Sequence, residues 1–246
     1  MRFMYSLLIA IIMNALLLSA HASNNQNIVL KTPDFAKYSV IKQKKTAFFN
    51  FMRGIIKTEN KRVLQRRNKL GSLRNKSSLT VTEKQWLLNT AKKYNVKFSN
   101  IKNRKAWQNL MSRVDIVPIE LTMAQAANES SWGTSRFARK GRNFFGQWCF
   151  RKGCGLVPSR RNKGARHEVA VFKTVNASVA AYIHNLNTGR VYAGLRKIRQ
   201  QQRAKNKQPE AIAMAGGLIK YSIRRMAYVK EIRAMIRYNR KLMLGK

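Results

Sequence analysis

The chain has 246 residues, of which 50 are Lys or Arg and 9 are Asp or Glu, so its formal net charge is +41. Hydrophobic residues make up 45% of it and it carries 4 Trp, 8 Tyr and 11 Phe, which excludes an intrinsically disordered chain. The charge predicts a polyanionic partner: a nucleic acid, an anionic membrane surface or an anionic wall polymer.

Residues 1–22 have the three parts of a secretory signal peptide. Arg2 is their only charge, residues 3–18 are mostly apolar, and an A-x-A cleavage pattern ends at Ala22. A transmembrane anchor, the alternative, needs an apolar run of about 20 residues, which is longer than this one. We therefore expect cleavage near Ala22 and a protein of the periplasm or cell envelope. Export excludes nucleic acid as the partner and favours an anionic envelope surface or the wall.

The region that follows the leader is basic and has a helical pattern. Between residues 35 and 70, large apolar residues recur at spacings of three and four among Lys and Arg, which predicts one or two helices with a basic outer face. That face is either simply solvated or adheres to a membrane or wall. Residues 71–78 are predicted to be a linker. The predicted division is a leader (1–22), a basic helical extension (23–78) and one domain (79–246).

The rest of the chain is predicted to be mainly helical. Thr80 and Glu83 form a capping-box pattern before a helix over 84–94. Residues 119–130 follow Pro118 with apolar residues on one helical face, and we expect Gly133 to end that helix. Further helices are expected over 104–113, 177–186, 191–204, 210–219 and 224–244, and short strands over 143–150 and 168–172. The pattern predicts a mainly α (α+β) fold with a small β element.

Two cysteines, Cys149 and Cys154, lie close together around a glycine. In an oxidising compartment such a pair can close a small loop, so we expect a disulfide. Two thiols alone do not make a structural zinc site, and the three histidines do not fall at ligand spacing. We expect no metal and no cofactor.

Glu129 has a sequence context that suits a proton donor. It ends an apolar helix, where the negative end of the helix dipole disfavours a charged carboxylate, and Trp132 adds an apolar wall. The nearest following cation is Arg136. These conditions raise a carboxyl pKa, as a general acid requires. The alternative is a surface or structural glutamate.

Glu168 lies in a short alternating segment and is open to two interpretations. It either pairs with Arg166 or Lys173, or it is the second carboxyl of a glycoside hydrolase, which activates water or stabilises the oxocarbenium-like charge. Side chains between the two acids suit a sugar cleft, with amides for hydroxyl and N-acetyl groups and rings for stacking; they are Asn143, Phe144, Phe145, Gln147 and Trp148. For the Phe residues, a hydrophobic core strand is the alternative.

Five blocks of the sequence resemble a known family. They read AANESSWGTSRFA (126–138), NFFGQWCF (143–150), GARHEVAVF (164–172), SVAAYIHNLN (178–187) and YSIRRMAYV (221–229). Together they resemble the Bax-type proteins of Gram-negative bacteria, which carry the N-acetylglucosaminidase domain of glycoside hydrolase family 73, related to the flagellar peptidoglycan hydrolase domain. The resemblance covers roughly residues 110–240.

The resemblance implies a lysozyme-like fold, with a helical lobe and a small β-hairpin lobe beside a cleft. It implies endo-hydrolysis of the β-1,4 bond after N-acetylglucosamine in peptidoglycan. Glu129 matches the family's general acid and Glu168 its hairpin glutamate. Tyr228 matches a tyrosine that lines the site, with Tyr221 as its neighbour, and Phe144–Gly146 matches an element under the sugar. Arg225 departs from the pattern, which has Gly there, so the turn before Tyr228 is open to question.

The predicted function is therefore an exported peptidoglycan glucosaminidase that needs no cofactor. Its predicted partner is the glycan strand of peptidoglycan, and we expect a monomer. Two alternatives remain at this stage. One is a non-catalytic cationic protein that binds the wall or a membrane surface. The other is a cationic nucleic-acid binder, which would require the leader not to function.

Overall fold

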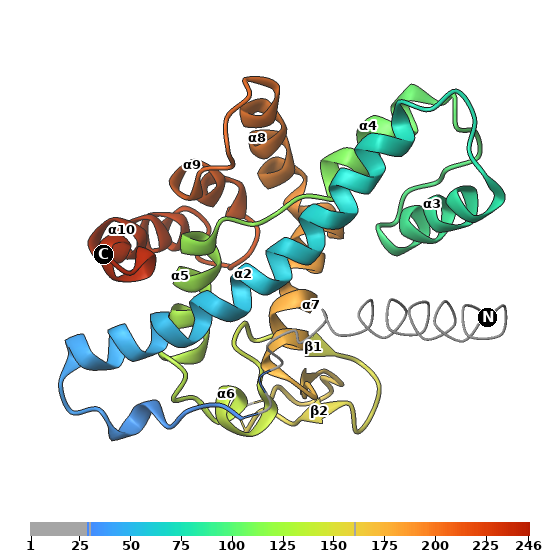
Figure 1. Ribbon diagram of the computed structural model, residues 1–246. Coiled ribbons are helices and arrows are strands. Elements are labelled where there is room, and N and C mark those ends of the chain that lie inside the picture. The colour runs from blue at the N-terminus through green and yellow to red at the C-terminus, as the bar shows by residue number, and fades with distance from the viewer. Residues whose placement is uncertain (1–28, 30, 160) are drawn as a thin grey trace, which may run out of the picture.

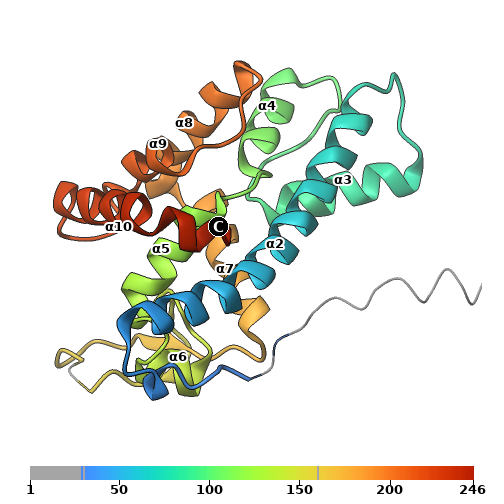
Figure 2. The ribbon, with the colours of Figure 1, turned by 60° about the vertical axis from the view of Figure 1, so that its left-hand side comes forward.

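One long helix organises the molecule. The computed structural model describes residues 29, 31–159 and 161–246, so the predicted leader lies outside the described residues. Helix α2 (Ile41–Arg74) lies across α5 (Ile119–Ser130), α7 (Val175–Thr188) and α10 (Met226–Leu244), as both views show (Figures 1 and 2). Within the described part of the chain, no helix is long and apolar enough to cross a membrane.

Helix α2 extends past the predicted helical region, which ended at residue 70. A 3-10 turn, η1 (Phe35–Lys37), precedes it, and it then runs without a break to Arg74. The prediction that residues 71–78 form a linker is therefore wrong for residues 71–74. Leu70 and Leu73 are 0% and 3% exposed, so the core-facing stripe of the helix continues through Gly71.

The two sides of the predicted boundary at residue 78 share one hydrophobic core. Phe48, Phe49 and Met52 of α2 belong to the same cluster of buried side chains as Leu121 of α5 and Val229 of α10. The predicted domain boundary stays a prediction, but the basic extension contributes directly to the packing around α5.

The helices around this core follow the predicted pattern closely. Helix α3 (Val81–Lys93) begins with a complete capping box, because Glu83 N donates to Thr80 Oγ1 (3.2 Å) and Thr80 N donates to Glu83 Oε2 (3.0 Å). The remaining helical elements are α4 (Arg104–Arg113), α6 (Arg136–Gly141), η2 (Arg190–Tyr192), α8 (Ala193–Ala204), α9 (Ala211–Ala215) and η3 (Gly216–Leu218). The sequence did not predict α6, a single short turn capped by Ser135.

The β element is a three-stranded antiparallel sheet. Its strands are β1 (Trp148–Cys149), β2 (Gly155–Leu156) and β3 (Glu168–Ala170), in the order β1-β3-β2. The predicted strand over 143–150 is wrong for residues 143–147, which form a loop. The mainly α fold with a small β lobe is confirmed, and the arrangement is consistent with a lysozyme-like architecture.

Candidate active site

Glu129 lies in the last turn of α5, directly before an unusual left-handed turn. The helix ends at Ser130 rather than at Gly133, and Ser131, Trp132 and Gly133 have φ angles of 51°, 58° and 79°. Ser130 Oγ holds the turn, because it donates to Ala126 O (2.6 Å) and accepts from Gly133 N (2.8 Å). A Cβ at residue 133 would lie 2.4 Å from the Phe35 ring, so this position requires glycine for space as well as for φ.

A chain of buried hydrogen bonds ends on the Glu129 carboxyl. Tyr228 Oη donates to Glu129 Oε1 at 2.8 Å, and Gln125 Nε2 donates to Tyr228 Oη at 2.9 Å. Tyr182 Oη donates to Gln125 Oε1. Each donor in this chain points its hydrogen toward Glu129, so the orientation of the Gln125 amide and both hydroxyl groups is determined.

Tyrosine rings surround the Glu129 carboxyl. Tyr221 stacks on Tyr228 with centroids 5.3 Å apart, and Tyr192 lies 6.0 Å from Tyr221. Burial raises the pKa of Tyr182, Tyr192, Tyr221 and Tyr228, and the Glu129 charge raises each of them further. The site is therefore a cluster of neutral phenols around one half-buried carboxyl group.

Burial also raises the pKa of Glu129 itself. Hydrogen bonds from Tyr228 and Asn128 oppose the shift, and the nearby charge of Glu231 adds to it. Glu231 lies one helical turn after Tyr228 on α10 and forms an ion pair with Arg224, N–O 2.8 Å. The net effect is a raised pKa, so the Glu129 carboxyl stays protonated to a higher pH than a solvated glutamate.

Trp132 faces the N-terminal helix. Its ring meets Phe48 and Phe49 edge-on, at centroid distances of 5.7 and 5.3 Å, and Lys45 Nζ lies 5.2 Å from its centre. The half-buried indole thus joins the turn after Glu129 to α2. The sequence predicted that Trp132 would supply the apolar wall beside Glu129. Tyrosines that are distant in the sequence also surround it: Tyr228 donates a hydrogen bond to its carboxyl, and the Glu129 charge raises the pKa of Tyr221 and Tyr228.

The loop of residues 143–147 is built around Asn143, which is 1% exposed. Its Nδ2 donates to Gln147 O and Ala170 O, both at 2.9 Å, and its Oδ1 accepts from Gln147 N at 3.1 Å. These bonds replace a strand ladder, which explains why the predicted strand is a loop. Gln147 Nε2 donates to Ser178 O at 3.0 Å, and Gly146 has a φ of 63°.

The two phenylalanines of this loop have different neighbours. Phe144 is 0% exposed and packs near Phe48 and Phe51, so its ring belongs to the core, as the alternative interpretation held. Phe145 stacks on Tyr182 with centroids 4.0 Å apart, and its carbonyl accepts from Tyr221 Oη at 3.3 Å. Phe145 thereby links the loop to the hydrogen-bond chain of Glu129.

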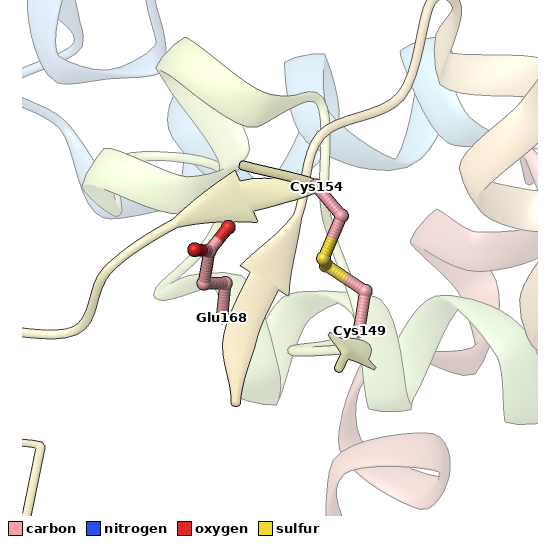
Figure 3. A group of neighbouring side chains, drawn as sticks. All are labelled: Cys149, Cys154 and Glu168. Carbon is pink, nitrogen blue, oxygen red and sulfur yellow. A yellow bond between two sulfur atoms is a disulfide. The ribbon is translucent and has the colours of Figure 1, made fainter. Parts of the chain in front are cut away.

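Glu168 lies on the β lobe with its carboxylate held by backbone groups. Gly153 N donates to Oε1 at 3.0 Å and Gly155 N donates to Oε2 at 2.8 Å, and these bonds lower the pKa of Glu168. The predicted disulfide between Cys149 and Cys154 is present beside it (Figure 3). Because the two cysteines are bonded to each other, neither offers a thiolate to a metal.

The structure therefore brings together only part of the predicted set. Glu129, Tyr228, Tyr221 and Phe145 form one connected group, while no described hydrogen bond joins Glu168 or Trp148 to it. Sequence reasoning missed Gln125, Tyr182 and Tyr192. Gln125 precedes Glu129 by one helical turn, so the two side chains lie on the same face of the helix. A polar residue on this otherwise apolar stretch was the signal that could have identified Gln125 as a neighbour of the acid.

Comparisons with known proteins agree with this picture. A family model described as "Glucosaminidase: Mannosyl-glycoprotein endo-beta-N-acetylglucosaminidase" matches residues 104–241. The chain is similar to "Protein bax" of Escherichia coli (strain K12), with 35% identity over 210 residues, which cover 85% of this chain and 75% of that protein. No solved structure matches. The matched segment contains the Glu129 site and the β lobe, and the chain belongs to the glucosaminidase family.

Proposed function

We propose that this protein is an exported peptidoglycan hydrolase, an endo-β-N-acetylglucosaminidase that cleaves the β-1,4 bond after N-acetylglucosamine. The proposal rests on one observation above all. A half-buried glutamate at a helix end, with its pKa raised by burial, accepts a hydrogen bond from Tyr228 in a cluster of tyrosines. Membership of the glucosaminidase family supports the reaction class.

Glu129 is the general acid of the proposed reaction. Tyr228 fixes Oε1 by donating to it, so the proton is carried on the other carboxyl oxygen. That proton passes to the glycosidic oxygen as the bond to the anomeric carbon breaks, and the leaving sugar departs with a free hydroxyl group. Burial raises the pKa of the acid, which favours its neutral form until the transfer.

Water attacks the anomeric carbon with help from a second group. Glu168 is one candidate for that group, and the N-acetyl group of the substrate is the other. Both Glu168 oxygens accept backbone N–H bonds that lower the pKa of its carboxyl, and a lower pKa makes a weaker base. This favours assistance by the substrate's own N-acetyl group, with Glu168 holding the loop of the β lobe.

The predicted export supports peptidoglycan as the substrate. The leader-type sequence of residues 1–22 would take the protein to the periplasm or envelope, where peptidoglycan lies. A net charge of +41 favours adhesion to its anionic peptide stems or to an anionic envelope surface.

The test is mass spectrometry of the muropeptides that the mature protein releases from purified peptidoglycan. The proposal expects fragments with N-acetylglucosamine at the new reducing end, and no release by Glu129→Gln. Glu120→Gln is the matched control, because it removes the same charge from the other end of α5 and is expected to release fragments normally. Binding without release by the parent protein would instead support a non-catalytic wall-binding protein.

A further inference from the structure

The β lobe exposes a group of aromatic side chains that the site around Glu129 does not use. Trp148 is 59% exposed and Phe150 is 73% exposed. The His167 ring stacks on Trp148 with centroids 4.0 Å apart and planes 17° apart, while Phe150 meets Trp148 edge-on at 6.5 Å. We refer to Trp148, Phe150 and His167 as the aromatic platform. Since His167 covers only one side of an indole this exposed, much of the ring surface remains open to a ligand.

The platform stands on a rigid base. Cys149, between Trp148 and Phe150, is bonded to Cys154 and pairs with Glu168 across the sheet. Glu168 in turn accepts backbone N–H bonds from Gly153 and Gly155, the residues on either side of Cys154. The disulfide, the strand pairing and the carboxylate therefore fix the short loop, and a preorganised aromatic surface loses little entropy when it binds a ligand.

Apart from the buried Glu168, the described Asp, Glu, Lys and Arg side chains of residues 149–168 are all cations. Between Cys149 and Glu168 the sequence contains no Asp or Glu. The described cations of this stretch are Arg151, Lys152, Arg161, Lys163 and Arg166. Exposed aromatic rings in a stretch of chain rich in cations favour a ligand with apolar faces and carboxylate groups.

We propose that the aromatic platform is a second glycan-binding surface, which stacks on a sugar ring of an anionic amino-sugar polymer while the neighbouring cations bind its carboxylates. The C–H groups on one face of a pyranose carry partial positive charge and meet the negative face of an indole or phenyl ring. This inference rests on the proposed function, because it takes the same peptidoglycan strand as the ligand.

The position of the platform agrees with a strand that extends beyond the bond being cut. Trp148 follows Phe145 by three residues, and Phe145 stacks on Tyr182 of the hydrogen-bond chain. Gln147, between them, is tied to α7 through Ser178 O. One continuous loop therefore connects the residues around Glu129 to the platform, and in this proposal one glycan strand contacts both.

The experiment measures retention of the mature protein on insoluble peptidoglycan. Every variant also carries Glu129→Gln, so that the substrate stays intact during the measurement. At about 0.5 M NaCl, where exposed charges are screened over a few ångströms, removal of both rings by Trp148→Ala with Phe150→Ala is expected to weaken retention about tenfold or more. Trp148→Phe keeps a ring and is expected to stay close to the parent.

Two further variants control for the loss of an exposed ring elsewhere and for folding. Tyr238→Ala removes an aromatic ring that is 88% exposed on α10 and is expected to leave retention unchanged. Trp148→Leu keeps an apolar side chain but no ring, and it should weaken retention while thermal unfolding and the disulfide stay as in the parent. Equal retention of the parent and the double alanine variant at this NaCl concentration would overturn the proposal that the platform binds glycan.

The two proposals fail in different ways. If Glu129→Gln still releases muropeptides, the assignment of the acid fails, and retention is then measured at low temperature over times too short for cleavage. If Trp148→Ala with Phe150→Ala, made without Glu129→Gln, releases muropeptides normally, and the same pair of changes made with Glu129→Gln is retained normally, the platform fails and the proposed hydrolase stands.

Discussion

Two glutamates in this molecule have opposite surroundings. Glu129 ends a helix among tyrosine rings, where burial penalises its charged form and raises its pKa. Glu168 begins a strand, where the backbone N–H groups of Gly153 and Gly155 stabilise its charged form and lower its pKa. The same side chain is therefore suited to donate a proton in the first place and to hold a loop in the second.

The largest expected effect comes from neutralising the two glutamates separately. Glu129→Gln is expected to reduce reducing-end release from peptidoglycan by about 10²–10⁴-fold, which is the usual contribution of a general acid. Glu168→Gln is expected to cost less than about tenfold in rate, because it loses a loop contact and no proton transfer. An equally large loss for Glu168→Gln would contradict the comparison and restore Glu168 as the base.

Tyr228→Phe tests the hydrogen bond that Tyr228 donates to the acid. It removes the hydrogen bond that favours the charged form of Glu129, so the pKa of Glu129 rises further. Activity that needs the protonated acid then persists to higher pH, and the alkaline limb of the pH–rate profile moves upward. We also expect a loss of about tenfold at the optimum, since the carboxyl is no longer oriented. A limb that moves to lower pH would show that Tyr228 acts differently.

Glu231→Gln should have the opposite and smaller effect on the same limb. The Glu231 charge contributes to the raised pKa of Glu129, and removing it also leaves Arg224 without its ion-pair partner. Both changes stabilise the charged form of Glu129, so the alkaline limb moves to lower pH. The matched control is Glu120→Gln, which breaks the Arg240 ion pair at the far end of α5 and is expected to leave the limb in place.

Arg225→Gly should stabilise the fold with little effect on either glutamate. Arg225 has a φ of 46° and a ψ of −113° at the start of α10, a conformation that costs a residue with a Cβ about 1–3 kcal/mol. After the greater chain entropy of Gly in the unfolded state, we expect a net gain of about 1 kcal/mol and a rise in Tm of about 2–4 °C. Arg225→Lys keeps the strain and should leave Tm unchanged.

The sequence predicted the helices well because their signals are local. The Thr80–Glu83 capping box and the apolar spacing of α5 and α10 need no knowledge of the rest of the chain. It failed at residues 143–147, where the buried amide of Asn143 organises a loop that reads as a strand. It also placed a linker at 71–78, of which residues 71–74 are helical, because the burial of Leu73 depends on neighbours that are distant in the sequence.

The surroundings of Glu129 were predicted only in part: the resemblance named Tyr228 and Tyr221, and nothing in the sequence analysis named Tyr182 or Tyr192. Glu129 stands out in the sequence because acids are scarce, and Arg225 stands out against the family pattern. The tyrosines around Glu129 come from η2, α7, α10 and the segment before it, and only the packing of those elements brings them together. A short-range context therefore suggests which group reacts, whereas its environment is a property of the fold.

The packing of helix α2 matters for any truncation of this protein to the segment that matches the family, residues 104–241. The family match begins at residue 104, yet Phe48 of α2 meets both Trp132 and Phe144, and Phe35 fills the space beside Gly133. A fragment that begins at residue 104 would present these apolar surfaces to water, where they invite self-association. Expression trials should therefore keep α2 together with the matched segment.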